Sequence, residues 1–344
     1  MSDISQRKLD HIDLCLHEDV AMAQASTGFE RYRFMHQALP EIALEAISLE
    51  TTFLGRAFAA PILIASMTGG PERGETINRN LAAAAEALNL PMGVGSQRIM
   101  IERPEAAASF KAAREAAPGA MILGNIGAVQ LNYGVTTAQV IAAVAAIGAD
   151  GVYLHLNALQ EAIQPGGDTD FSGLLDRIAE VCEAAPFPVL AKEVGSGIAP
   201  DTAKALVARG VQAIDVAGAG GTSWAKIEAH RAAEPAQRTL GEVFESWGIP
   251  TTESLRLCRE ALPETPLVAS GGVRTGLDAA KAIALGADMV SFAMPLLGPA
   301  TRSAAEVEAA IRQILAELRL AMFLVGAKDI PALRARRDRL RLLA

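Results

Sequence analysis

The stretch that decides the fold reads Pro266-Leu-Val-Ala-Ser-Gly-Gly-Val-Arg274, and the later stretch Gly286-Ala-Asp-Met-Val-Ser-Phe-Ala-Met294 repeats its pattern. Each contains a short apolar run, which is typical of a buried strand. The first run ends at Gly271-Gly272, where the missing side chains let backbone N–H groups approach an anion. Residues 277–285 between the runs have helical spacing. The sequence therefore predicts a strand-helix-strand unit with a phosphate-binding loop, although an isolated Ser-Gly-Gly could also be a purely structural loop.

The position of this unit near the end of a long chain favours one fold class. A (β/α)8 barrel binds phosphate at the loops after its seventh and eighth strands. Six earlier segments repeat the strand pattern and run into polar or glycine-rich residues: 61–66, 90–95, 120–124, 151–155, 188–191 and 213–217. Alanine-rich helical stretches fall between them at 80–88, 137–147 and 202–208. This alternation predicts the α/β class and a (β/α)8 TIM barrel of parallel strands.

The chain of 344 residues is predicted to form a single barrel domain. A barrel needs about 250 residues, which leaves room for an extension at each end. We expect a helical N-terminal cover over 1–55, the barrel over 56–300 and closing helices over 301–344, one of them amphipathic around 307–324. The connection 218–262 is too long for one helix, which predicts an inserted segment over the site.

Composition excludes several classes of partner. The formal net charge of −8 gives no reason to expect a nucleic acid. The basic run 334–341 is interpreted as a solvated helix face, with a membrane-surface or subunit contact as the alternative. No membrane partner is expected, because there is no run of 18 apolar residues and residues 2–13 are too charged for a signal peptide. Three cysteines without metal or redox spacing indicate the reducing cytoplasm.

Polar residues at the predicted strand ends indicate the chemistry. Lys192 follows the fifth strand beside Glu193, and a lysine in a barrel mouth is costly without an anionic partner. A phosphate or an electron-rich cofactor ring would supply that partner. A Schiff-base lysine and a structural Lys–Glu pair are the alternatives.

A second polar cluster follows the fourth strand and comprises His155, Asn157, Gln160 and Glu161. Gln160 could hydrogen-bond a substrate, and Glu161 could bind a hard cation. A single carboxylate suits Mg²⁺ better than zinc, because Mg²⁺ keeps waters and takes further ligands from substrate phosphates. Taken alone, His155 would be interpreted as a core histidine.

Motifs spread over nearly the whole chain, in order, resemble type 2 isopentenyl diphosphate isomerase. Each motif is weak by itself, since Ser-Gly-Gly-hydrophobic-Arg also occurs in other flavin barrels, but the set is specific. The motifs are Arg7-Lys8, Met67-Thr68-Gly69-Gly70, Gly95-Ser96-Gln97-Arg98, His155-Leu156-Asn157 with Gln160-Glu161, Lys192-Glu193-Val194-Gly195, Gly220-Gly221-Thr222-Ser223-Trp224, Trp247-Gly248-Ile249-Pro250-Thr251 and Ser270-Gly271-Gly272-Val273-Arg274.

The resemblance implies an enzyme that interconverts isopentenyl and dimethylallyl diphosphate and requires FMN, Mg²⁺ and NADPH without net redox change. It implies a set of FMN contacts: Met67, Thr68, Gly69, Ser96, Asn125, Lys192, Thr222, Gly271, Gly272, Val273, Arg274, Ala293 and Met294. It implies substrate contacts from Arg7, Lys8, Arg98, His155, Asn157 and Gln160, and a Mg²⁺ ligand in Glu161. A homo-oligomer, a tetramer or an octamer, is also implied.

The expected chemistry protonates an unactivated double bond and removes an allylic proton, for which ordinary side chains are poor acids. The resemblance implies that N5 of reduced FMN donates and accepts these protons, within a catalytic group of Gln160, His155, Asn157 and Lys192. One alternative is an FMN-dependent 2-hydroxy-acid oxidase, which needs a histidine base. Residues 216–224 contain no histidine, and His230 is the only one after residue 155. The other alternative is a flavin-binding barrel without turnover, which would not need a Mg²⁺ ligand.

Overall fold

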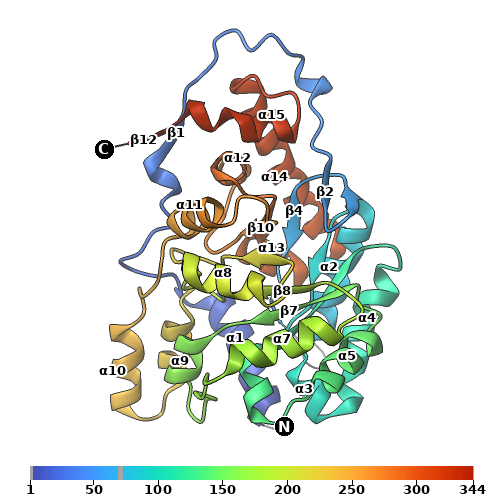
Figure 1. Ribbon diagram of the computed structural model, residues 1–344, viewed down its shortest axis with the longest axis vertical. Coiled ribbons are helices and arrows are strands. Elements are labelled where there is room, and N and C mark those ends of the chain that lie inside the picture. The colour runs from blue at the N-terminus through green and yellow to red at the C-terminus, as the bar shows by residue number, and fades with distance from the viewer. Residues whose placement is uncertain (1–2, 69–72, 344) are drawn as a thin grey trace.

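Eight parallel strands close into a barrel, as predicted (Figure 1). The structure is a computed structural model, and it describes residues 3–68 and 73–343. The order around the ring is β10-β11-β4-β5-β6-β7-β8-β9, and β9 pairs with β10 to close it. The strands are β4 (Ile62–Ile64), β5 (Met92–Gly93), β6 (Ile122–Gly127), β7 (Gly151–His155), β8 (Val189–Lys192), β9 (Ala213–Asp215), β10 (Leu267–Ala269) and β11 (Met289–Phe292).

A helix follows each strand and covers the outside of the barrel. These helices are α2 (Arg73–Leu88), α4 (Ala108–Ala116), α5 (Thr137–Ala146), α7 (Leu174–Ala184), α8 (Pro200–Ala208), α11 (Thr251–Ala261), α12 (Gly276–Leu285) and α14 (Ala304–Leu324). Alternate strand residues such as Leu63, Leu190 and Val268 fill the interior, while their neighbours face the helices. None of the helices in the described ranges is long and apolar enough to cross a membrane.

In the described N-terminal segment the only α-helix is α1 (Asp3–His17), which contacts α9 (Trp224–Arg231) and α13 (Met294–Ala300), and two short 3-10 turns follow at Phe29–Arg31 and Leu44–Ala46. The chain then forms β1 (Tyr32–Phe34) and a hairpin of β2 (Thr51–Phe53) and β3 (Arg56–Phe58). Phe53 and Phe58 of the hairpin pack on the barrel interior. The expectation of a helical cover across residues 1–55 was therefore too broad.

Residues 32–34 and 340–342, far apart in the sequence, meet in a small sheet that local patterns could not reveal. β1 pairs antiparallel with β12 (Leu340–Leu342), and the two lie side by side at one edge of the molecule (Figure 1). The basic run 334–341 consequently crosses α15 (Ile330–Ala335), a 3-10 turn and β12, so its interpretation as one helix face was wrong. Arg334 pairs with Asp288 at 3.0 Å, and Arg337 lies 3.5 Å from Glu260.

The long connection after β9 contains two helices before α11, which are α9 and α10 (Pro235–Val243). α9 packs on α6 (Ala158–Ile163) and on α1, so it lies at the mouth of the barrel. α10 packs mainly on α9 and is more peripheral. The inserted segment thus lines the cavity through the loop that precedes α9 and through Trp224, the first residue of α9.

The loops after β9 and β10 approach each other backbone to backbone. Gly271 has a φ of +95°, and a Cβ at this position would lie 2.1 Å from the carbonyl oxygen of Gly218. Gly272 has a φ of +68°, and its Cβ would lie 2.6 Å from the carbonyl oxygen of Gly220. Only glycine satisfies both constraints, which is why the predicted phosphate loop has this composition.

We predict that Gly271→Ala destabilises the protein by about 2–4 kcal/mol, from left-handed strain together with overpacking. Gly134→Ala is the matched control, because Gly134 has a φ of +93° with no atom within 4 Å of the added Cβ. The control should lose only about 1 kcal/mol. Denaturant unfolding measures both values, and equal losses would show that the contact with Gly218 is unimportant.

Candidate active site

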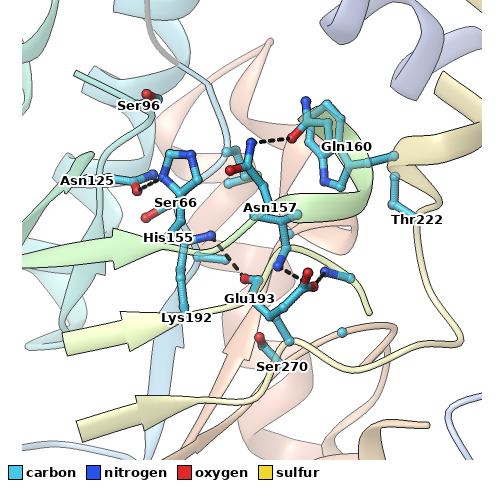
Figure 2. Close-up of a pocket in the computed structure, with 18 of the residues that line it drawn as sticks. Ser66, Ser96, Asn125, His155, Asn157, Gln160, Lys192, Glu193, Thr222 and Ser270 are labelled. Atoms are coloured by element: carbon cyan, nitrogen blue, oxygen red, sulfur yellow. Dashed lines mark hydrogen bonds between the residues drawn. The ribbon is translucent and has the colours of Figure 1, made fainter. Parts of the chain in front are cut away.

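One cavity of about 280 Å³ occupies the end of the barrel where the strands terminate. Every residue assigned to the site from sequence lines this cavity, except Gly69, which lies outside the described residues. Figure 2 shows side chains from successive strand ends turned toward the same space. The structure thus brings the expected residues together, while their individual roles remain predictions.

Three ionisable side chains occupy one level of the barrel. The register pairs Gly127 with His155, His155 with Lys192, and Lys192 with Asp215 across β6, β7, β8 and β9. In-register residues of neighbouring strands point to the same side of a sheet. His155, Lys192 and Asp215 therefore form a row along the wall of the cavity.

Lys192 is half-buried, and the only hydrogen bond of its side chain among the described residues is a long one of 3.4 Å to the backbone oxygen of Glu193 (Figure 2). Burial lowers the pKa of Lys192, and the charges of Asp215 and Glu193 oppose that shift. The Glu193 carboxylate turns away from the lysine. Its Oε2 accepts the backbone N–H groups of Val194 and Gly195, both at 2.6 Å, and that of Ser196. The structural Lys–Glu pair considered from sequence does not form, so the ammonium is left to meet a ligand.

Asp215 was not identified as a site residue from sequence, and Glu193 was named there only as the neighbour and possible partner of Lys192. Asp215 accepts hydrogen bonds from the Ser270 hydroxyl and, at 3.3 Å, from the backbone N–H of Ala217. Burial raises the pKa of Asp215 to about 6, and burial raises that of Glu193 to about 7 despite its three N–H donors. Each follows or ends a strand without a distinguishing local pattern.

His155 is a neutral side chain. Its Nδ1 lies 2.8 Å from Oδ1 of Asn125 (Figure 2). Burial, together with the charge of Lys192, lowers the pKa of His155 to about 3. Because the amide oxygen can only accept, Nδ1 carries the single proton and Nε2 remains an acceptor.

We predict that ¹⁵N NMR shows His155 as the neutral Nδ1–H tautomer from pH 8 down to pH 5, with His155→Gln identifying the signal. The folded pKa lies below the unfolded value of about 6.5. The contribution to stability is therefore complete above pH 6.5 and is lost as the pH falls toward 3, at up to about 1.4 kcal/mol per pH unit. A titration midpoint near 6.5 would contradict this environment.

A chain of amides and acids follows β7. Asn157 donates from Nδ2 to Oε1 of Glu161 at 2.8 Å and to Oε1 of Gln160 at 3.3 Å. Gln160 donates in turn to Oε1 of Glu228 at 3.2 Å. Oδ1 of Asn157 is buried without a partner among the described residues. The amide of Gln160 is thereby held at both ends, and an unsatisfied oxygen lies beside Glu161.

Glu228 was also missed, because nothing in the sequence distinguishes it from other helical glutamates. Its side chain is fully buried in α9, 3.0 Å from Nε2 of His11 and 2.7 Å from Arg231. Burial alone would raise the pKa of Glu228, but His11 and Arg231 bring it below its usual value. Glu228 thus ties α1 and α6 to α9.

Cations from two elements enter the cavity on the side of β5. Lys8 of α1 donates to the backbone oxygen of Ser96 at 3.0 Å, and its burial, with Arg7 beside it, lowers the pKa of Lys8 to about 7. Arg98 begins α3 (Arg98–Glu102) and pairs with Glu102 at 2.8 Å. Arg7 and Lys8 reach the cavity of their own chain, so the cover folds back on its own barrel.

The donor set fits a flavin phosphate and a single cation. The glycine loops after β9 and β10 expose backbone at the cavity, and Lys192 offers a buried ammonium to an anionic ring. Glu161 and the unsatisfied Asn157 oxygen offer ligands to a hard cation. No group of three or more acidic, histidine or cysteine side chains gathers in the described residues, so a metal would complete its shell with water and substrate oxygens.

The fold and cavity are those of a flavin-dependent barrel. The sequence matches the FMN-dependent dehydrogenase family over residues 2–113 and 167–340. A crystal structure of a mandelate oxidase variant is similar in fold with a TM-score of 0.68 and 19% identity, covering 100% of both chains. The flavin-binding domain of baker's yeast flavocytochrome b2 has a TM-score of 0.69 and 18% identity, covering 94% of this chain and 79% of that one.

Closer relatives specify the branch of this family. An isopentenyl-diphosphate delta-isomerase of Synechococcus sp. is 52% identical over 97% of this chain and 95% of its own length. The isopentenyl-diphosphate delta-isomerase of Pseudescherichia vulneris is 49% identical over 96% of this chain and 95% of its own length. The isopentenyl-diphosphate delta-isomerase of Mycobacterium marinum is 49% identical over 97% of this chain and 96% of its own length. The chain belongs to the isopentenyl-diphosphate delta-isomerase family, in its FMN-dependent form.

Proposed function

We propose that this protein interconverts isopentenyl diphosphate and dimethylallyl diphosphate with reduced FMN, NADPH as the source of reduction, and Mg²⁺ on the substrate diphosphate. The observation that carries the proposal is one cavity with two anion-binding ends. The glycine loop after β10 lies at one end, and the cations Arg7, Lys8 and Arg98 lie near β5. β5 and β10 are three strands apart in the ring of eight, so the ends are well separated. One end suits the FMN phosphate, and the other suits the substrate diphosphate.

The residues between these ends support proton transfer rather than net oxidation. When bound, reduced FMN supplies a weakly acidic and basic nitrogen, N5, next to the substrate carbon chain. Lys192 balances negative charge on the reduced ring, and neutral His155 adds no competing charge. Gln160 orients the substrate, because Asn157 and Glu228 fix its amide. The helix α1 contributes Arg7, Lys8, His11, Ile12 and Cys15 to the cavity wall, and a site shielded from water would strengthen each of these interactions.

Glu161 is the proposed Mg²⁺ ligand. It is buried, and its oxygens accept only N–H donors, from Asn157, Gln164 and the backbone of Asp168. These bonds leave lone pairs for a cation, and the diphosphate would supply further oxygen ligands. Met67, Thr68, Ser96 and Thr222 are proposed to contact the flavin from their places in the cavity wall.

The alternatives are less consistent with the site. A 2-hydroxy-acid oxidase needs a histidine base, but His230 is exposed and is not among the residues that line the cavity. His155 is held neutral by an environment that makes it a weak base. A flavin carrier without turnover would not require the buried arrangement of Gln160, Glu161 and Glu228. We also infer a cytoplasmic location, in keeping with three free cysteines, and a homo-oligomeric assembly that light scattering would measure.

The decisive experiment is an assay of the purified protein with isopentenyl diphosphate, with and without NADPH and Mg²⁺, together with an absorbance spectrum. The proposal requires releasable FMN and formation of dimethylallyl diphosphate only under reducing conditions. A preparation that oxidises 2-hydroxy acids, or that cannot be reconstituted with FMN, would overturn it.

We predict that Glu161→Gln reduces activity by about a hundredfold or more and raises the Mg²⁺ concentration for half-maximal rate, because an amide lacks the charge a hard cation needs. FMN content should stay at the wild-type level, since Glu161 is separate from the glycine loops. Glu115→Gln, on the exterior helix α4, is a control that changes the same charge away from the cavity. An unchanged Mg²⁺ response would assign Glu161 a structural role.

We predict that the double variant Arg7→Ala/Lys8→Ala raises KM for isopentenyl diphosphate by about ten- to a hundredfold for each charged hydrogen bond lost. Reduction of FMN by NADPH should change little. Because the pKa of Lys8 is lowered to about 7, its charge is present below pH 7 and lost above it, so kcat/KM of the wild type should fall above pH 7.

The exposed residue Lys111 provides the control, because Lys111→Ala removes a cation that does not line the cavity. This variant should keep wild-type kinetics and the wild-type pH profile. Wild-type KM in the double variant would show that α1 makes no contribution to substrate binding.

A further inference from the structure

One residue, Asp168, joins three βα loops on the cation-rich side of the cavity, two through its carboxylate and the third through its backbone N–H. Its Oδ2 accepts from Arg98 at 2.7 Å and from Gln130 at 2.9 Å. Its backbone N–H donates to Oε2 of Glu161 at 2.9 Å. Arg98 follows β5, Gln130 follows β6 and Glu161 follows β7. One residue therefore contacts the side chains expected to meet both the diphosphate and the metal.

The surrounding loop is built to hold Asp168 in place. A Cβ on the preceding Gly167 would lie 2.0 Å from the backbone oxygen of Glu161, so only glycine permits this close return of the chain. Asn132 donates to the backbone oxygens of Asp170 and Ser172, both at 2.9 Å. Asp168 is thus fixed to the turn after β6 from both sides.

The position of Asp168 determines the geometry of Arg98. The Arg98–Asp168 contact is well shielded, since the side chain of Asp168 is 13% exposed and that of Arg98 is 26% exposed. A planar guanidinium held by two acids has a defined orientation and needs no rearrangement to receive a phosphate group. Glu102, the other acid on Arg98, is 40% exposed and lies one helical turn away on the same helix.

We propose that Asp168 is a positioning residue that joins Arg98, Gln130 and Glu161 into one preformed receptor for a diphosphate–Mg²⁺ pair. The inference rests on the proposed function, which it deepens by making cation binding and diphosphate binding interdependent. Because the two ligands share a support, loss of Asp168 should weaken both together. An arginine and a glutamate that acted independently would not show this link.

The first test is binding of inorganic pyrophosphate to the FMN-loaded protein by calorimetry at several Mg²⁺ concentrations. Asp168→Asn keeps the size of the side chain and the backbone N–H to Glu161, but loses the charge that orients Arg98. We expect pyrophosphate affinity to fall about ten- to a hundredfold and the Mg²⁺ requirement to rise with it. Glu102→Gln, which removes the other acid on Arg98, should affect both values much less.

The second test is kinetic. Asp168→Asn should raise KM for isopentenyl diphosphate with a far smaller change in kcat, and FMN content and melting temperature should stay close to wild type. Adding Arg98→Ala to Asp168→Asn should cost less than Arg98→Ala alone, because the two residues act as a unit. Asp168→Ser replaces Asp168→Asn if the latter does not fold.

Unchanged or tighter pyrophosphate binding in Asp168→Asn would overturn the inference, because it would mean that the acid merely opposes the anion. Equal effects of Asp168→Asn and Glu102→Gln would also overturn it. The binding experiment is independent of turnover. A wild-type protein that binds pyrophosphate with Mg²⁺ but does not isomerise the substrate would contradict the proposed function. The inference about Asp168 would then be decided by the pyrophosphate binding of Asp168→Asn alone.

Discussion

The ammonium of Lys192, half-buried in the wall of the cavity, is the constraint on which the organisation of the site depends. It lies in a row with His155 and Asp215, and the carboxylate of its sequence neighbour Glu193 is bound to backbone N–H groups instead. A charge in this position is costly unless a ligand or a nearby acid offsets it. Asp215 supplies part of the compensation at a distance, and a reduced flavin ring would supply the rest. The site is therefore prepared for an electron-rich cofactor before the cofactor binds.

Closure of the mouth depends on another buried acid, Glu228. It binds His11 from the cover, Arg231 from its own helix, and Gln160 from the opposite loop. One carboxylate consequently contacts both α1 and the amide of Gln160 in the cavity wall. Removing it would leave Gln160 and His11 without their shared acceptor, so the cover and the reacting end of the cavity cannot be treated separately.

The same barrel serves different chemistry in its structural relatives. Mandelate oxidase and flavocytochrome b2 share the architecture at 18–19% identity, which shows that the fold is compatible with many sequences. The distinction lies in the groups placed at the strand ends. Here His155, the amides of Asn157 and Gln160, and the cations Arg7, Lys8 and Arg98 line the cavity at those positions.

The sequence alone determined the eight strands, their parallel order and many of the residues that line the cavity. It could do so because each strand is a short apolar run, and because parallel strands must end at the same edge, so the residues that follow them converge. The sequence also predicted the loop at Gly271-Gly272, since two adjacent residues without side chains indicate a close approach of the backbone.

Only the tertiary structure decided how distant charges meet. Asp168, Asp215 and Glu228 have no local signature, and their importance arises from contacts with loops far away in sequence. The pairing of β1 with β12 is another case, because about 300 residues separate the two strands in the sequence. Apolar periodicity predicts which face of an element is buried, but it does not predict which acidic side chain contacts which basic one. That choice is made by the register of the closed barrel and by the packing of α1 and α9 across its mouth.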